Sequence, residues 1–313
     1  MQENDLSLAP EKTELIALMG RKKTAEMKVD VLGMHMPAQN KIRYLGVTMD
    51  KSLSCSHHIE TAANKAEKAS MALGKLMPRT KGPRTSTRRI LNSVVNSIVL
   101  YAAPVWIDAL KIEKNRKTLV KTQRSALIRM CGAYRTVSAA AMQVIASVSS
   151  IDLLAYERSY NFGADPKNKI QNRKWLLGRW QNRWDKIKEG RWTWELIRRV
   201  DKWLGRKHGE LDFYLTQVLT GHGSFSTYLK RIQKAEDDIC AQCNLIDSPE
   251  HTIFKCRRWD EIRQRSEPAI GEKIEKRNFI DIMIRSESGW SKLSRMCRAI
   301  ITAKDTAEQR VPT

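Results

Sequence analysis

Residues 56–77 read SHHIETAANKAEKASMALGKLM, and their apolar residues recur at steps of three and four. The residues on this repeat are Ile59, Ala62, Ala63, Ala66, Ala69, Leu73 and Leu76. This period places them on one face of an α-helix that is buried against other elements. The following MPRTKGPRT (77–85) contains two prolines and a glycine, which end the helix. The stretch therefore predicts a mainly helical fold.

The residues before this helix predict short β-strands. ELIALM (14–19), KVDVLGMHM (28–36) and KIRYLGVTMD (41–50) are apolar or alternate between apolar and polar residues. Gly33 indicates a hairpin bend, and PAQN (37–40) indicates a turn. We therefore expect a small N-terminal β portion in front of a compact helical bundle, an α+β arrangement that is mainly α.

Further helices are expected after residue 85. One is predicted at about 85–102, with an inner face formed by Ile90, Leu91, Val94, Val95 and Ile98. The next is predicted near 115–131 and buries Leu119, Ala126, Leu127 and Met130. Two more are expected at about 137–148 and from Ile151 onward. The segment GADPKNK (163–169) favours a domain boundary, because it is polar and contains Gly and Pro.

The composition limits the function. The chain has 313 residues, enough for two or three domains, and a formal net charge of +22. This excess of Lys and Arg predicts a polyanionic partner, with nucleic acid favoured over an acidic membrane surface. No run of eighteen apolar residues is present, and the opening MQENDLSLAPEKTE does not resemble a secretory leader. We expect an intracellular protein with reduced cysteines and no membrane partner.

Two segments concentrate the positive charge. Residues 65–89 contain eight basic residues and one acidic residue, which favours a phosphate-binding face over an ordinary solvated helix face. The expected contacts are Lys65, Lys68, Lys75, Arg79, Lys81, Arg84, Arg88 and Arg89. Residues 167–207 contain fourteen basic residues, four acidic residues and six tryptophans, with Arg179, Arg183 and Lys186 beside two of the tryptophans. We expect most of these tryptophans in a helical core and one or two available to stack on bases.

The segment CAQCNLIDSPEHTIFKC (240–256) combines three cysteines with one histidine. The spacing Cys240-x2-Cys243-x7-His251-x4-Cys256 suits tetrahedral zinc, and four protein ligands leave no position for water, so the site would be structural. The alternatives are a cysteine pair on a helix face with an unrelated histidine, or a redox pair. A CCHC zinc knuckle that grips single-stranded nucleic acid is favoured. Its flanks supply phosphate contacts at Lys230, Arg231, Lys255, Arg257 and Arg258.

Smaller motifs receive simpler interpretations. His57 and His58 follow Cys55, but a helix N-terminus explains them better than a second metal site. Gly221-His222-Gly223 predicts a tight turn, and Cys131 and Cys297 are expected to be buried as small apolar residues.

Several segments together resemble a known family. LSLAPEKTELIALMGRKK (6–23) and IRYLGVTMD (42–50) are similar to the end of the palm domain in reverse transcriptases of non-LTR, LINE-type retrotransposons. KAEKASMALGKLMPRTKGP, RRILNSVVNSIVLYAAPVW and AYRTVSAAAMQVIASVSSIDLLAYER resemble the thumb and the helices that follow it. LTQVLTGHGSFSTYLKRI and the CCHC motif resemble the tail of the same polyproteins. The closest pattern is that of arthropod elements that insert into ribosomal RNA genes.

The resemblance implies a C-terminal fragment of an RNA-directed DNA polymerase with a linked endonuclease. The implied divisions are 1–50 (end of the palm), 51–163 (thumb and following helices), 164–235 (basic Trp-rich segment), 236–260 (zinc knuckle) and 261–313 (basic tail with a fraying end). The implied partners are the element RNA and the target DNA, in the nucleus and in a cytoplasmic ribonucleoprotein. The alternative is a stand-alone, non-enzymatic zinc-knuckle protein that binds RNA or DNA.

The sequence departs from the family at the catalytic centre. Such polymerases bind two Mg²⁺ ions through palm carboxylates, two of which lie in a Tyr/Phe-x-Asp-Asp hairpin. This chain has no such tetrapeptide, and its only Asp-Asp pair is Asp237-Asp238. We therefore expect no catalytic residue and no Mg²⁺ in this fragment, which would not polymerise alone.

Overall fold

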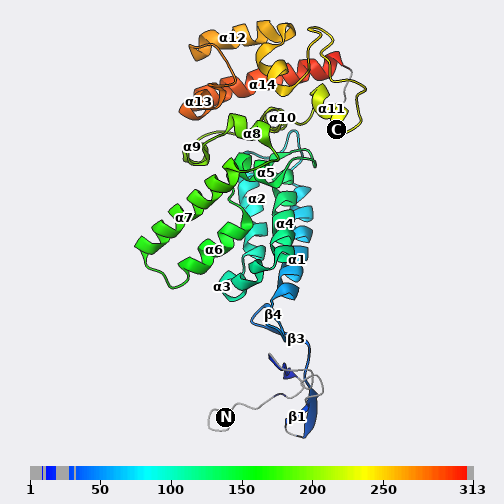
Figure 1. The fold of residues 1–313 in the computed structure, drawn as a ribbon, viewed down its shortest axis with the longest axis vertical. Coiled ribbons are helices and arrows are strands. Elements are labelled where there is room, and N and C mark those ends of the chain that lie inside the picture. The colour runs from blue at the N-terminus through cyan, green and yellow to red at the C-terminus, as the bar shows by residue number, and fades with distance from the viewer. Residues whose placement is uncertain (1–8, 10–11, 19–27, 32, 309–313) are drawn as a thin grey trace.

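Two β-hairpins lie at one end of the computed structural model, which describes residues 9, 12–18, 28–31 and 33–308. Strand β1 (Lys28–Val31) pairs antiparallel with β2 (Met34–Pro37), and β3 (Lys41–Tyr44) pairs antiparallel with β4 (Val47–Asp50). Gly33 has a φ of +80°, a left-handed conformation that glycine adopts at low cost, and lies between β1 and β2 as predicted. Figure 1 shows the hairpins projecting from the helical body.

The first predicted strand, residues 14–19, is not formed. Met19 lies outside the described residues, as do parts of the 6–23 segment quoted above. Ile16 makes one isolated bridge with Gln39, and the Gln39 amide donates to the Leu15 carbonyl at 2.7 Å. A single bridge does not build a ladder, since a strand needs a paired neighbour along several residues.

Helix α1 (Ser56–Gly74) is the helix that opens the predicted bundle. Ile59, Ala62, Ala63 and Ala66 are buried, as the three-and-four spacing predicts. Leu76 differs from the prediction and is exposed, because the helix has already ended before it.

Helix α2 (Thr85–Val99) forms as predicted but turns a different face to the core. Ile90 and Val94 are 69% and 43% exposed, whereas Val95 and Val99 are buried. The buried stripe begins with the polar residues Thr85, Arg88 and Asn92 and continues with Val95 and Val99 at helical spacing. A prediction from the spacing of apolar residues misses a buried face that contains polar residues.

The next elements agree with the predicted helices. The chain continues through α3 (Ala103–Trp106), the 3₁₀ turn η4 (Ile107–Lys111), α4 (Glu113–Cys131), α5 (Ala139–Ala146) and α6 (Ile151–Asn161). All four apolar residues predicted to be buried in the helix at 115–131 are buried in α4. Ser138 caps α5, since its hydroxyl accepts a hydrogen bond from the Ala141 amide.

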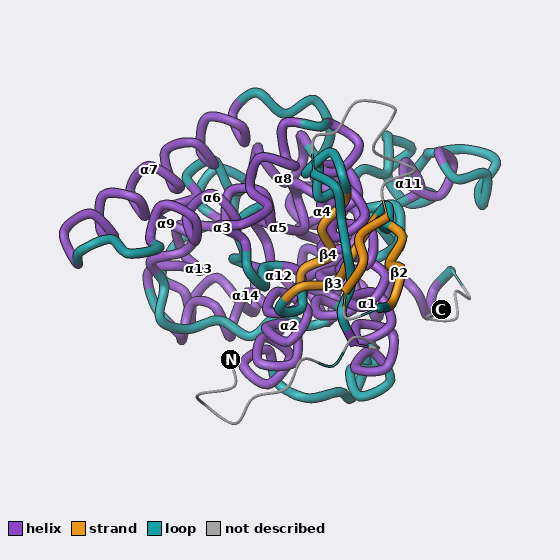
Figure 2. Tube along the Cα trace, turned by 90° about the horizontal axis from the view of Figure 1, so that it is seen from below, coloured by secondary structure: helices purple, strands orange, loops and turns teal. Residues whose placement is uncertain are grey.

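The regular elements of the second half of the chain are all helices or helical turns over its described length. It contains α7 (Pro166–Asp185), α8 (Arg191–Leu196), α9 (Val200–Gly205), α10 (Phe213–Thr220), α11 (Ser226–Arg231), the π-helical turn η5 (His251–Lys255), the 3₁₀ turn η6 (Arg257–Trp259), α12 (Asp260–Ile270), α13 (Phe279–Arg285) and α14 (Glu287–Ala307). Helices α12 to α14 form a layer at the end opposite the hairpins (Figure 1). Figure 2, seen along the long axis, shows strands in only one small part of the molecule.

Two apolar cores hold the helices together, and α4 contributes to both. The first core contains Ile59 of α1, Val95 of α2 and Leu119 of α4. The second core contains Leu127 of α4 and extends through α7 and α10 to α14. The cores do not divide at residues 163 and 164, where the sequence predicts a boundary, because α6 and α7 pack together on the second core.

The C-terminal residues form helices, as expected for the basic segment after Arg258, and these helices pack into the body of the protein. Trp290 and Cys297 of α14 are buried in the second core. The polar end at 309–313 lies outside the described residues. Trp180, Trp184 and Trp203 are buried as well, and the other three tryptophans of the basic segment are partly buried against the same core, as expected for most of the six. Over the described residues, no single helix has the length and apolar character to cross a membrane, although two bent helix pairs together do.

Candidate metal centre and basic surfaces

The structure brings Cys240, Cys243, His251 and Cys256 into one cluster. One potential ligand atom from each of the four residues lies within 4.8 Å of the others. The Sγ atom of Cys256 is 3.8 Å from that of Cys240 and 3.6 Å from that of Cys243. Two thiolates that each lie about 2.3 Å from a tetrahedral zinc ion are about 3.8 Å apart, so the cluster has the spacing of a metal site.

A tight backbone turn places the first two ligands. The Asn244 amide donates to the Cys240 carbonyl at 2.9 Å, and the Cys240 amide donates to the Leu245 carbonyl at 2.7 Å. Asn244 adopts a positive φ of 52°, which Asn tolerates better than most residues. Ile239 and Ile246 then form an antiparallel bridge that closes the turn.

The other two ligands stand at either end of the π-helical turn η5. The Cys256 amide donates to the His251 carbonyl at 2.7 Å, a hydrogen bond that closes this turn and brings the two residues together. His251 is buried, and its Nε2 atom makes no hydrogen bond. A buried polar atom without a partner is rare, and a bound metal ion would supply one.

The electrostatics of the cluster also fit a cation. Burial lowers the pKa of His251, which keeps the imidazole in the neutral form that binds metals. Burial raises the pKa of Cys256 to about 12, so an ionised thiolate there requires compensation by positive charge. The Cys243 thiol is held below its ordinary pKa, since backbone and thiol hydrogen bonds outweigh its burial. The donor set is that of a metal such as zinc.

Buried polar contacts connect this loop to the C-terminal helices. The Asp247 carboxylate accepts hydrogen bonds from Ser226, Thr252 and Lys304, all at 2.9 Å or less. Arg263 of α12 is buried and donates to the carbonyls of Ile253 and Cys256. The cluster is therefore part of the second core.

The other cysteines and the histidine pair do not form a second cluster among the described residues. His58 is buried against Trp106, with ring centroids 6.2 Å apart, and His57 lies beside Lys41. Cys131 and Cys297 are buried, and burial raises the pKa of both thiols. The Gly221-His222-Gly223 turn follows α10, with positive φ at both glycines, and the His222 ring is buried beside Arg231.

The predicted phosphate contacts at residues 65–89 are mostly accessible. The side chains of Lys65, Lys68, Lys75, Lys81, Arg84 and Arg89 are exposed, and the Arg79 guanidinium lies 5.5 Å from the Tyr134 ring. Arg88 differs from the prediction, because it is 6% exposed and donates to backbone carbonyls that include those of Pro83 and Met130. Its role is to join α2 to the end of α4.

The predicted contacts on α7 lie along a groove. Arg179, Arg183 and Lys186 line a cavity of about 780 Å³ between α6 and α7. Arg183 also forms an ion pair with the buried Asp152 at 2.7 Å, so its positive charge is partly neutralised within the protein.

Aromatic rings line the same groove. Trp175 is half-buried, and its ring centroid lies 5.2 Å from that of Tyr160, which is 49% exposed. Trp175 is the tryptophan of the basic segment that lines this groove. Tyr156 and Tyr160 were not predicted, although their spacing of four residues on one helix could have indicated a shared face.

The basic residues beside the metal cluster are exposed but partly paired. Lys230 pairs with Asp238 at 2.8 Å, and Lys255 pairs with Glu250 at 2.5 Å. The Arg231 guanidinium lies over the Tyr228 ring, whereas Arg257 and Arg258 are exposed on η6. Asp238 is therefore the ion-pair partner of Lys230.

Comparison with known proteins shows that the chain is similar to proteins of transposable elements. It is 27% identical over 281 residues to the putative 115 kDa protein in type-1 retrotransposable element R1DM of Drosophila melanogaster. It is 25% identical over 293 residues to the retrovirus-related Pol polyprotein from type-1 retrotransposable element R1 2 of Nasonia vitripennis. Its homologues are R1 retrotransposon Pol polyproteins. The resemblance to non-LTR elements of arthropods is thus confirmed.

The coverage of these R1 proteins differs. The aligned residues are 82% of this chain and 27% of the Drosophila protein, and 85% of this chain and 71% of the Nasonia protein. An R1 Pol polyprotein of Bradysia coprophila is 24% identical over 74% of this chain, which spans 25% of that relative. The chain thus spans about a quarter of the Drosophila and Bradysia R1 proteins. No family model and no solved structure matches the chain.

Proposed function

We propose that this chain is the thumb and nucleic-acid-binding C-terminal part of an R1-type reverse transcriptase polyprotein, acting in target-primed reverse transcription. The observation that carries the proposal is the similarity to R1 Pol polyproteins over most of the chain. The helical body fits a thumb and the helices after it, and the hairpins at 28–50 fit the end of a palm. The parent enzyme is an RNA-directed DNA polymerase with endonuclease, and its partners are the element RNA and the target DNA in the nucleus.

The chain's own contribution is binding rather than polymerisation. Among the described residues, the group of His, Cys, Asp or Glu side chains that lies close enough together to hold a metal ion is the Cys and His cluster. Asp238 is held by Lys230, and no Tyr/Phe-x-Asp-Asp tetrapeptide occurs in the sequence. With template, primer, Mg²⁺ and nucleotides, the isolated chain is expected to add no nucleotide, and extension by clean protein would contradict this assignment.

The groove between α6 and α7 supports binding to single strands. It combines exposed cations at Arg179 and Lys186 with the half-buried Trp175 and the exposed Tyr160. Phosphates bind to cations, and unpaired bases stack on aromatic rings at about 1–3 kcal/mol per base. The stand-alone protein is a less favoured alternative, since the similarity to Pol polyproteins extends over most of the chain.

Zinc at the Cys and His cluster would have a structural role. With four protein ligands the ion has no open position, so it orders the loop that carries Lys255, Arg257 and Arg258. These side chains would then face a nucleic-acid strand as a fixed group.

The salt dependence of RNA binding tests the proposal. The logarithm of affinity for single-stranded RNA should fall linearly with the logarithm of salt concentration, by about 0.7 for each phosphate contact. The double substitution Arg179→Gln and Lys186→Gln should reduce the slope by about 1.4. Arg183 is left intact, because its removal would leave Asp152 buried and unpaired.

A matched control removes the same charge elsewhere. Lys51→Gln and Lys114→Gln neutralise two exposed lysines outside the groove and the predicted basic faces. This control should change the slope much less than the groove variant. Equal slopes for the two variants would remove the groove from the interface, and absence of binding by the wild-type chain would contradict the proposed function.

A further inference from the structure

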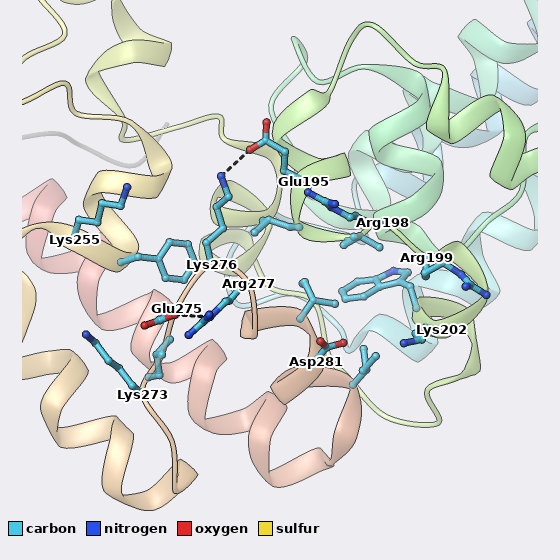
Figure 3. Close-up of a pocket in the computed structure, with 17 residues that line it drawn as sticks. Glu195, Arg198, Arg199, Lys202, Lys255, Lys273, Glu275, Lys276, Arg277 and Asp281 are labelled. Carbon is cyan, nitrogen blue, oxygen red and sulfur yellow. Dashed lines mark hydrogen bonds and ion pairs between the residues drawn. The ribbon is translucent and has the colours of Figure 1, made fainter.

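A second cleft shares no lining residue with the α6–α7 groove. Its volume is about 760 Å³, and α8 and α9 form one wall. The loop between α12 and α13, with the end of η5, forms the other wall (Figure 3). Of the basic residues here, only Lys255 is among the phosphate contacts named from the sequence, because the walls come from three separate segments of the chain.

The rim of this cleft carries excess positive charge. Lys276 pairs with Glu195 and Glu250, and Arg199 and Arg277 pair with neighbouring carboxylates. Within the described part of the chain, Arg198, Lys202 and Lys273 have no carboxylate partner, and all three are exposed. Uncompensated cations around a concave surface attract a polyanion, since the cleft focuses their field.

The floor of the cleft is apolar. Phe254 lines it together with Trp203, Ile274 and Ile284. Phe254 is half-buried and packs edge-on against Phe279, with ring centroids 5.4 Å apart, so its orientation is fixed. A simple inorganic anion gains nothing from such a floor, whereas a nucleotide presents phosphate at one end and an apolar base face at the other.

We propose that this cleft binds one or two nucleotides of a single strand, with the phosphates at Arg198, Lys202 and Lys273 and a base against Phe254. The inference rests on the proposed function and adds a site to it. A duplex keeps its bases stacked inside the helix and would not reach the floor. The cleft therefore selects single strands over duplexes.

The metal cluster positions one wall of this cleft. Phe254 and Lys255 stand between the ligands His251 and Cys256 in η5. Lys276 joins that wall to α8, since its Nζ atom lies 2.9 Å from Glu195 and 2.6 Å from Glu250 (Figure 3 shows the contact with Glu195). The placement of Phe254 thus depends on the order of the metal loop.

Photocrosslinking combined with a charge variant tests the proposal. The probe is a single-stranded RNA of about 12 nucleotides carrying 5-iodouridine, which allows several stacking positions. The wild-type chain should crosslink within the peptide that contains Phe254, and Phe254→Leu should lose this crosslink while keeping an apolar side chain of similar size. Lys202→Gln with Lys273→Gln should weaken binding about tenfold more for the RNA than for a duplex of the same sequence.

The control is again Lys51→Gln with Lys114→Gln, which removes equal charge outside the cleft. If the wild-type chain binds the RNA but the cleft variant matches this control and no crosslink falls on residues 253–255, the cleft proposal is overturned and the proposed function stands. Equal losses for RNA and duplex would contradict the role of the apolar floor. If the wild-type chain binds no single strand at all, the proposed function itself fails.

Discussion

Asp247 and Lys304 form a buried ion pair, 2.7 Å long, that joins the loop between Cys243 and His251 to the last helix. The two side chains are 1% and 3% exposed. Burial opposes ionisation of Asp247, but Lys304 and the hydrogen bonds from Thr252 and Ser226 outweigh it and hold the pKa of Asp247 below its ordinary value. The metal loop and α14 are therefore parts of one cooperative unit.

Removing the cation of this pair should destabilise the second core. Lys304→Met leaves the Asp247 carboxylate buried without its partner, and the free energy of unfolding should fall by about 3–5 kcal/mol. Arg295→Met, on the exposed face of the same helix, should change it by less than about 0.5 kcal/mol. Urea unfolding measures both. Equal effects would mean that the ion pair does not join the loop to α14.

Replacing Arg88 should lower the stability of the fold, whereas replacing its neighbour Arg89 should remove surface charge and leave the stability nearly unchanged. Arg88→Ala leaves buried carbonyls of the 77–83 turn and of α4 without a donor, at a cost of about 1–3 kcal/mol. Arg89→Ala removes an exposed cation and should leave the unfolding midpoint nearly unchanged. The reverse order in thermal unfolding would contradict the structural role of Arg88.

A chelator should loosen more than the metal loop. Because the loop contacts α12 and α14 through Arg263 and Lys304, metal removal should increase amide exchange over 238–259 and in both helices. The helices of the first core, α1 and α2, should keep their protection, since they share no core residue with the loop. Hydrogen exchange measures each segment. Increased exchange confined to 238–259 would show that the metal loop is an independent module.

The sequence predicted the elements whose apolar residues follow a clean period. Leu119, Ala126 and Leu127 identified the buried face of α4, and the spacing of Cys240 and Cys243 indicated the metal cluster. These signals are local, because each depends on residues within one element or one short loop.

Prediction from the sequence failed for buried faces that contain polar residues and for sites formed by segments that are distant in the chain. Arg88 and Asn92 occupy the buried stripe of α2, so the predicted face included Ile90, which is exposed. The cleft cations Lys202 and Lys273 come from α9 and from the loop after α12, and no pattern along the chain relates them. Such sites depend on tertiary packing.

The metal content of the purified chain is the most direct test of the proposed metal centre. The wild-type chain should carry a single zinc ion, and cobalt substitution should give the visible spectrum of tetrahedral ligation by three sulfurs and one nitrogen. Cys256→Ser should lose the metal, whereas Cys297→Ala, which changes a buried cysteine outside the cluster, should retain it. A metal-free wild-type chain with fully reduced thiols, or equal metal loss in the two variants, would contradict the assignment of Cys240, Cys243, His251 and Cys256 as a metal centre.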